Sequence, residues 1–155
     1  MSLQIYIASD HNGYNLKNLI IEWLNQDFIN RLPKHIDTIY PIDMGPNNHE
    51  KCDYPYYAHM VSKLVSLNKN SIGIVICGTG TGMSIVCNRY NSIRCALCHN
   101  IESAKLAKLH NNANILSLGA KFLSKSDAFN IIEEFIKNDF EGGRHENRIN
   151  QINKN

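Results

Sequence analysis

The sequence predicts an α/β fold, a Rossmann-like three-layer α/β/α sandwich with a five-stranded parallel sheet and a C-terminal helix. Short apolar segments that are typical of buried strands alternate along the chain with longer segments whose apolar residues recur at helical spacing. No linker or low-complexity stretch interrupts this alternation. With 155 residues, of which 43% are hydrophobic and 19% charged, the chain fits one domain over residues 1–155.

The first strand is expected at residues 3–9, before the polar break Asp10-His11-Asn12-Gly13, and the first helix at residues 14–28. Residues 72–77 are dense in isoleucine and valine, which is typical of a strand buried on both faces of a parallel sheet. The other strands are expected at residues 38–44, 93–98 and 114–118, and the other helices at 56–67, 83–90, 103–109 and 126–138. Such repeated units are connected by right-handed crossovers.

A polar tail follows the last of these helices. Residues 141–148 begin at the break Gly142-Gly143 and continue as a helix with little apolar face of its own. Arg144 and Arg148 are four residues apart and would share one face, where they could hold a phosphate or pair with acidic neighbours. From the pattern alone, a solvated face is slightly favoured over an anion clamp.

Charge and cysteine content exclude several classes of protein. The net charge of +2 is small and the lysines and arginines are scattered, so nucleic acid binding is not expected. No apolar stretch is as long as a membrane span, and the N-terminus lacks the features of a secretory signal, so we expect a cytoplasmic protein that does not bind membranes. Five cysteines, an odd number, indicate reduced thiols rather than a disulfide framework.

The segment Cys95-Ala96-Leu97-Cys98-His99 matches the spacing used to attach c-type haem. Because it lies in an expected strand, its two thiols would point to opposite faces of the sheet. We therefore expect two packed core cysteines rather than a haem site.

Candidate chemical groups follow three of the expected strands. Asp10 and His11 follow the first strand, Cys77 ends the third and opens the loop Gly78-Thr79-Gly80-Thr81-Gly82, and His99 follows the fourth. Parallel strands share one carboxyl edge, where such sheets bind ligands. His110 and Asn111 end a helix and would lie at the opposite edge, so they could join this site only across a subunit interface or through a local excursion.

The glycine-rich loop does not match a nucleotide-binding signature. It lacks the Lys-Ser/Thr of a P-loop, and its glycines have the spacing G-x-G-x-G instead of G-x-G-x-x-G. Its backbone amides suit a small phosphorylated ligand or a developing oxyanion, while Cys77 moves a proton or attacks a carbon.

Five blocks of the sequence together resemble ribose-5-phosphate isomerase type B, in that family's order and spacing over nearly the whole chain. The blocks are Ser9-Asp10-His11-Asn12-Gly13-Tyr14, Asp53-Tyr54-Pro55, residues 77–82, His110-Asn111-Asn112-Ala113-Asn114 and residues 141–148. The resemblance implies interconversion of D-ribose 5-phosphate and D-ribulose 5-phosphate through an enediolate in the non-oxidative pentose phosphate pathway, with no metal or organic cofactor.

The resemblance also implies a role for each matching residue. Cys77 is the base that carries the proton between C2 and C1, His110 is the acid that opens the sugar ring, and Asp10 accepts the hydroxyl proton. Thr79 and the glycines hold the enediolate oxygen, and the remaining groups bind or position the substrate. The glycines are Gly78, Gly80 and Gly82, the phosphate ligands are His11, Arg144 and Arg148, and the positioning groups are Tyr54 and Asn111.

The family builds each active site from two subunits, so the resemblance implies a homodimer or a homotetramer made of two dimers. The sequence departs from the family pattern in two places. Lys121 stands where many members have a phosphate-binding arginine, which would replace a bidentate fork by a point charge. Met83 occupies the position at which some members carry a catalytic glutamate, so Cys77 has no evident substitute.

Three alternatives remain open at this point. The related galactose-6-phosphate isomerase subunits share much of the pattern, so the substrate could be a hexose 6-phosphate such as allose or galactose 6-phosphate. A non-catalytic sugar-phosphate sensor would keep the arginines and the loop but would not need the thiol. A thiol hydrolase or phosphatase would use Cys77, yet the loop lacks the C-x5-R cradle of cysteine phosphatases.

Overall fold

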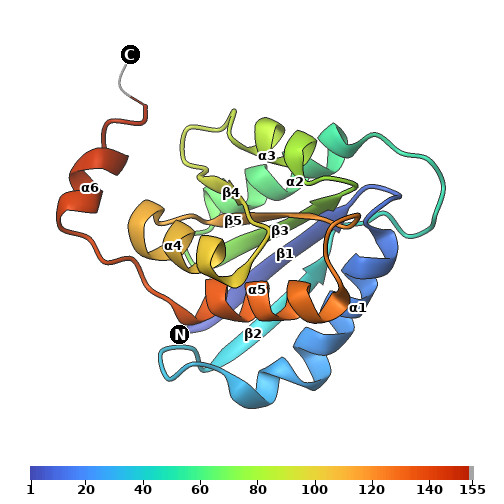
Figure 1. Cartoon of the computed structure of the whole chain (residues 1–155), viewed down its shortest axis with the longest axis horizontal. Coiled ribbons are helices and arrows are strands. Elements are labelled where there is room, and N and C mark those ends of the chain that lie inside the picture. The colour runs from blue at the N-terminus through green and yellow to red at the C-terminus, as the bar shows by residue number, and fades with distance from the viewer. Residues whose placement is uncertain (154–155) are drawn as a thin grey trace.

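A computed structural model of the chain, which describes residues 1–153, shows a five-stranded parallel sheet in the order β2-β1-β3-β5-β4 (Figure 1). The strands are β1 (Ser2–Ser9), β2 (Thr38–Asp43), β3 (Ser71–Cys77), β4 (Cys95–Leu97) and β5 (Ile115–Gly119). The helices are α1 (Tyr14–Gln26), the 3-10 turn η1 (Phe28–Arg31), α2 (Tyr54–Leu67), α3 (Thr81–Cys87), α4 (Ile101–Asn111), α5 (Lys125–Lys137) and α6 (Arg144–Ile149). The predicted α/β/α sandwich and parallel sheet are confirmed.

The connection between α3 and β4 differs most from the expected boundaries. The third helix covers residues 81–87 instead of 83–90, and the fourth strand covers residues 95–97 instead of 93–98. The side chain of Asn88 explains the early helix end, because it accepts a hydrogen bond from the Cys95 amide at 2.8 Å and donates one to the Cys95 carbonyl at 2.9 Å. These two bonds fasten the end of α3 directly to the start of β4.

Two apolar cores lie on the two faces of the sheet. Helices α1, α4 and α5 cover one face and α2 and α3 cover the other (Figure 1). Every residue of β3 is buried, as predicted for this strand. Cys98 packs in the core beneath α1, α4 and α5, whereas Cys95 packs against the core beneath α2 and α3. The two thiols therefore face opposite sides of the sheet, as predicted.

The strand order reverses between β1 and β3. From β1 the chain crosses to β2 on one side, and β3 then pairs with the other side of β1, with Ser9 opposite Ile76 at the carboxyl end. Ligands bind at such reversals of strand order, outside the carboxyl ends of the strands. At this reversal Gly13 lets the turn after β1 pack closely against β3, since a Cβ on Gly13 would lie 2.8 Å from the Ile76 carbonyl oxygen.

The polar tail forms the short helix α6 at the far end of the molecule from the carboxyl ends of the strands (Figure 1). The amide of Glu141 donates a hydrogen bond to the Leu109 carbonyl at 3.0 Å, which ties the start of the tail to the end of α4. No helix within residues 1–153 is long and apolar enough to cross a membrane.

Candidate active site

Cys77 lies at the carboxyl end of β3 with its side chain directed into the glycine-rich loop. The backbone amide of Gly80 donates a hydrogen bond to Sγ of Cys77 at 3.1 Å. The sulfur therefore lies within hydrogen-bonding distance of a backbone amide of the same loop that would bind an oxyanion. The thiol is 5% exposed and therefore largely shielded from bulk water.

The loop keeps its shape because of contacts that leave no room for side chains. Gly80 has a φ of 78°, and a Cβ at this position would lie 2.5 Å from Leu97 Cδ1. The buried hydroxyl of Ser117 on β5 donates a hydrogen bond to the Gly80 carbonyl at 2.6 Å. These contacts fix the direction of the Gly80 amide toward Cys77. Met83, which follows the loop, is fully buried between the sheet and α2, and its side chain carries no group that could act as a base.

The turn between β1 and α1 places Asp10 and His11 beside this loop. The Asp10 carboxylate is buried and accepts hydrogen bonds from the amides of Asn12 at 2.8 Å and Gly13 at 3.0 Å. His11 is half-buried, and its Nδ1 lies 3.3 Å from both the amide nitrogen and the carbonyl oxygen of Cys52. The turn is held to β3 because the Asp10 amide donates to the Ile76 carbonyl at 3.0 Å.

Tyr54 and Lys121 reach the same loop from the start of α2 and the end of β5. The Tyr54 ring lies directly against Gly82, where a Cβ would come within 2.6 Å of Tyr54 Cζ. The Lys121 side chain lies against Gly78, at 3.3 Å from the position of a Cβ, and the Lys121 amide donates to the Gly78 carbonyl at 3.0 Å. Tyr54, Thr79 and Lys121 are exposed, so this group of residues is open to a ligand.

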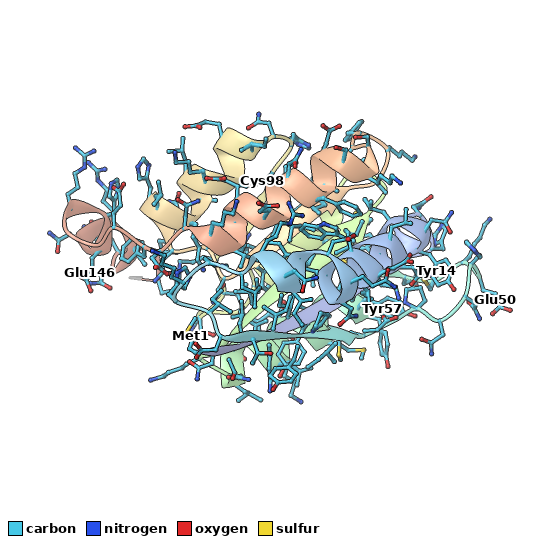
Figure 2. The ribbon with its side chains drawn as sticks, turned by 90° about the horizontal axis from the view of Figure 1, so that it is seen from below. Met1, Tyr14, Glu50, Tyr57, Cys98 and Glu146 are labelled. Atoms are coloured by element: carbon cyan, nitrogen blue, oxygen red, sulfur yellow. The ribbon has the colours of Figure 1, made fainter. Side chains whose placement is uncertain are left out.

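A second group of predicted residues lies elsewhere. His110, Asn111 and Arg148 line a pocket of about 320 Å³ together with His145 and two residues of the tail. His110 ends α4 and Arg148 belongs to α6, so this pocket is at the amino edge of the sheet. Figure 2 shows the separation, because Glu146 on α6 and Glu50 on the β2–α2 loop lie at opposite ends of the molecule. The structure thus divides the predicted site residues between two ends of one chain.

The His110 ring stacks on the ring of His145, with centroids 4.2 Å apart and planes 8° from parallel. Glu141 joins them, since its Oε2 lies 3.8 Å from Nε2 of His110 and 3.6 Å from Nε2 of His145. Burial lowers the pKa of His145, and the nearby charges of His110 and the arginines of α6 lower it further, against the opposing effect of Glu141. His145 is therefore expected to be neutral at neutral pH.

Among the described residues, His110, Glu141 and His145 form the one group of three that could hold a metal ion. Two imidazoles and one carboxylate are a suitable donor set for zinc. The arginines oppose a cation here, because Arg148 lines the same pocket and Arg144 and Arg148 both affect the pKa of His145. The surroundings favour an anion.

Two other candidates from the sequence lie outside both groups. His99 is exposed and packs edge-on against Phe122 with ring centroids 5.9 Å apart. Its neighbour Asn100 caps α4 by accepting a hydrogen bond from the Ser103 amide at 2.8 Å. Arg144 begins α6 but does not line the pocket that contains Arg148, although the two arginines are one helical turn apart.

Two arrangements near the predicted site residues were not predicted from the sequence. Lys17 is fully buried on α1 and pairs with Asp43, and the only signal in the sequence is a lysine on the apolar face of a helix. The stacking of His145 on His110 was not predicted, because it depends on the turn at Gly142 and Gly143, where both φ values are positive.

Comparisons with known proteins agree on one family. The family model described as Ribose/Galactose Isomerase matches residues 5–152. The ribose-5-phosphate isomerase B of Escherichia coli K12 is 34% identical over 149 residues, which are 96% of this chain and 93% of the relative. A solved ribose 5-phosphate isomerase from Thermotoga maritima is 42% identical with a TM-score of 0.85, and covers 96% of both chains.

A further solved structure, ribose-5-phosphate isomerase B from Mycoplasma genitalium with bound ribulose-5-phosphate, is 39% identical with a TM-score of 0.86. The match covers 98% of this chain and 95% of that one. The resemblance found in the five sequence blocks is thereby confirmed. The chain belongs to the ribose/galactose isomerase family and is a sugar-phosphate isomerase.

Proposed function

We propose that this enzyme interconverts D-ribose 5-phosphate and D-ribulose 5-phosphate, with Cys77 as the catalytic base, in the non-oxidative pentose phosphate pathway. The observation that carries this proposal is the bound ribulose-5-phosphate in the Mycoplasma genitalium relative. The thiol at the end of β3, which accepts a hydrogen bond from the Gly80 amide, supplies a group that can act as the base in the reaction.

In this mechanism, the Cys77 thiolate removes the proton from C2 of the open-chain aldose and returns it to C1. The electrons of the C2–H bond form the C1=C2 bond of the enediolate, and the loop that contains Gly78, Thr79, Gly80 and Gly82 holds the negative charge that develops on O1. As C1 takes up the proton, the C2 hydroxyl proton passes to O1, which leaves the ketone at C2. Ring opening comes first, with His110 as the acid toward the ring oxygen and Asp10 as the acceptor of the hydroxyl proton. His11, Lys121, Arg144 and Arg148 bind the phosphate, and Tyr54 and Asn111 position the sugar.

We further propose that the site is assembled from two chains of a homodimer. His110, Asn111 and Arg148 lie at the amino edge of the sheet, while Cys77 and Asp10 lie at the carboxyl edge, so one chain does not bring them together. A partner chain can supply the missing half to each site. A homotetramer of two such dimers would keep the same sites.

The first test is the rate of ribulose 5-phosphate formation from ribose 5-phosphate, measured with a chelator present and beside allose and galactose 6-phosphates. Preferred turnover of the pentose supports the proposal and the expectation that no metal is required. Turnover of a hexose 6-phosphate alone would assign the protein to the sibling isomerases. No turnover of any of the three would favour a sugar-phosphate sensor.

The shared site has its own test, which mixes two inactive variants. Cys77→Ser chains and His110→Asn chains are unfolded together, refolded and assayed. If each site takes Cys77 from one chain and His110 from the other, half of the dimers are mixed and each has one intact site, so about a quarter of wild-type activity returns. No recovery, with mixed dimers shown by mass spectrometry, would contradict a site shared in this way.

A further inference from the structure

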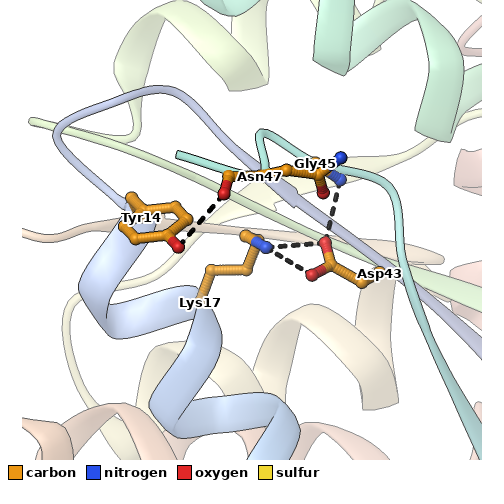
Figure 3. Close-up of polar contacts among 5 residues, drawn as sticks. All are labelled: Tyr14, Lys17, Asp43, Gly45 and Asn47. Carbon is orange, nitrogen blue, oxygen red and sulfur yellow. Dashed lines mark hydrogen bonds and ion pairs between the residues drawn. The ribbon is translucent and has the colours of Figure 1, made fainter. Parts of the chain in front are cut away.

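Lys17 is a fully buried lysine on the face of α1 that packs against the sheet. Its Nζ lies 2.6 Å from each carboxylate oxygen of Asp43, and 5.5 Å from the centroid of the Tyr14 ring (Figure 3). The Asp43 side chain is 39% exposed, so only the ammonium of Lys17 is fully removed from water. A buried charge must be compensated by its partner, and such pairs stabilise proteins no better on average than apolar side chains of similar size. Stability alone is therefore a weak reason for this pair.

Asp43 holds the point at which the chain leaves β2. Its Oδ1 also accepts a hydrogen bond from the Gly45 amide at 2.8 Å (Figure 3). The Gly45 carbonyl in turn accepts a hydrogen bond from the Ser9 amide at 3.0 Å, directly before Asp10. The ion pair thus joins α1, the end of β2 and the end of β1 at one place.

The β2–α2 loop, residues 44–53, continues from this place along the turn between β1 and α1. Tyr14 donates a hydrogen bond to the Asn47 carbonyl at 3.3 Å, and its ring packs edge-on against His49 at 4.2 Å. The last part of the loop contacts the His11 ring through the backbone of Cys52. Residues 47–51 are exposed, so the course of the loop depends on these anchors.

We propose that the Lys17–Asp43 pair is a positioning device for the substrate site, and this inference rests on the proposed function of that site. The pair touches neither Cys77 nor the glycine-rich loop. The pair fixes the position of the β2–α2 loop, which packs on His11 and leads into Tyr54. The Tyr54 ring lies on Gly82. Its loss displaces groups that hold the substrate while leaving the base on β3, so KM rises more than kcat falls.

The central variant is the double substitution Lys17→Met and Asp43→Leu, which replaces both charges by apolar side chains of similar length. Its Tm is expected to fall by several degrees, because a leucine at position 43 cannot accept the hydrogen bond from the buried Gly45 amide, while a methionine at position 17 removes the buried charge of Lys17. Its KM for ribose 5-phosphate is expected to rise about tenfold or more with a smaller change in kcat. Amide hydrogen exchange over residues 44–53 is expected to become faster in the absence of substrate.

Two further variants complete the design. Asp43→Asn removes the charge but can still accept the Gly45 hydrogen bond, so a smaller rise in KM is expected, and it provides the test if the double variant does not fold. Lys63→Met makes the same substitution at an exposed lysine of α2 and is expected to leave KM and exchange unchanged.

Unchanged KM and unchanged exchange over residues 44–53 in the folded double variant or in Asp43→Asn would overturn the positioning role. A fall in both Tm and kcat with an unchanged KM would also overturn it, since that result describes a structural role alone. The exchange measurement does not depend on turnover. A wild-type protein without activity on ribose 5-phosphate would therefore refute the proposed function separately, while faster exchange in the variants would still support the anchoring of the loop.

Discussion

The amide of Gly80 points at Sγ of Cys77 from 3.1 Å, so the loop that would hold an oxyanion also holds the thiol. Cys77→Ser keeps nearly the same volume but replaces a thiol by a hydroxyl, which is a much weaker acid. We expect kcat for ribose 5-phosphate to fall about a thousandfold or more, while the dissociation constant from calorimetry changes little.

Cys98→Ala is the matched control for this substitution. Cys98 is equally buried but packs in the core beneath α4, away from the glycine-rich loop, so activity should persist after any loss of stability is allowed for. A Cys77→Ser enzyme with near wild-type kcat would show that another group moves the proton.

Gly82 gives a second prediction through its contact with Tyr54. A methyl group at position 82 would come within 2.6 Å of Tyr54 Cζ, so Gly82→Ala should push the ring aside. Because Tyr54 is exposed, it can move without unfolding α2, and we expect a rise in KM of about tenfold with stability nearly unchanged.

The double variant Gly82→Ala with Tyr54→Ala separates this effect from damage to the loop itself. If the methyl group acts through the Tyr54 ring, the double variant should be no worse than Tyr54→Ala alone. Additive losses in KM would instead place the effect of the methyl group in the loop.

The order of strands and helices was predictable because periodicity reports which side chains are buried, as the fully buried β3 illustrates. The position of Cys77 and Asp10 at one edge followed from the same pattern, since parallel strands end together. The end of α3 was not predictable, because it depends on two hydrogen bonds between the Asn88 side chain and Cys95. Periodicity carries no information about such contacts.

His110 was correctly predicted to lie away from Cys77, because a helix that returns to the next parallel strand ends at the amino edge of the sheet, opposite to the edge that holds Cys77. The surroundings of His110 were not predicted. They depend on the backbone at Gly142 and Gly143, which turns α6 so that His145 stacks on His110. The pairing of Lys17 with Asp43 was likewise not predicted, because nothing local to either residue identifies the other as its partner.

Arg148 provides a prediction for the second group of residues. It lines the pocket that also contains His110, and a guanidinium can bind phosphate through two parallel hydrogen bonds. Arg148→Ala should raise KM for ribose 5-phosphate about tenfold to a hundredfold, and Arg148→Lys should recover part of the loss. The notable comparison is Arg144→Ala, which should also raise KM strongly if both arginines bind the phosphate.

Arg31→Ala serves as the control, because Arg31 is a surface residue 3.6 Å from Glu133 and remote from α6. Its KM should match that of the wild type. An unchanged KM in Arg144→Ala or Arg148→Ala would remove that residue from the phosphate site.

The lowered pKa of His145 predicts how the free energy of unfolding depends on pH. Its pKa in the folded chain is lowered, first by burial and then by His110 and Arg144, while Glu141 acts in the opposite direction. Below about pH 6.5 the unfolded chain therefore takes up a proton at this position more readily than the folded chain does. The contribution of His145 to stability is fully present above that pH and is lost as the pH falls toward the lower folded pKa.

The measurement compares wild type with His145→Phe by urea unfolding at pH 5 and pH 7.5, at equal protein concentration. Phenylalanine can still stack on His110 but does not titrate, so the loss of stability between the two pH values should be smaller in the variant. His35→Asn removes a half-buried histidine that lies 3.7 Å from Asp139, and it controls for the loss of an imidazole elsewhere in the chain. If His145→Phe and wild type lose the same free energy of unfolding on acidification, the protonation of His145 is not what weakens the packing of α6 on α4.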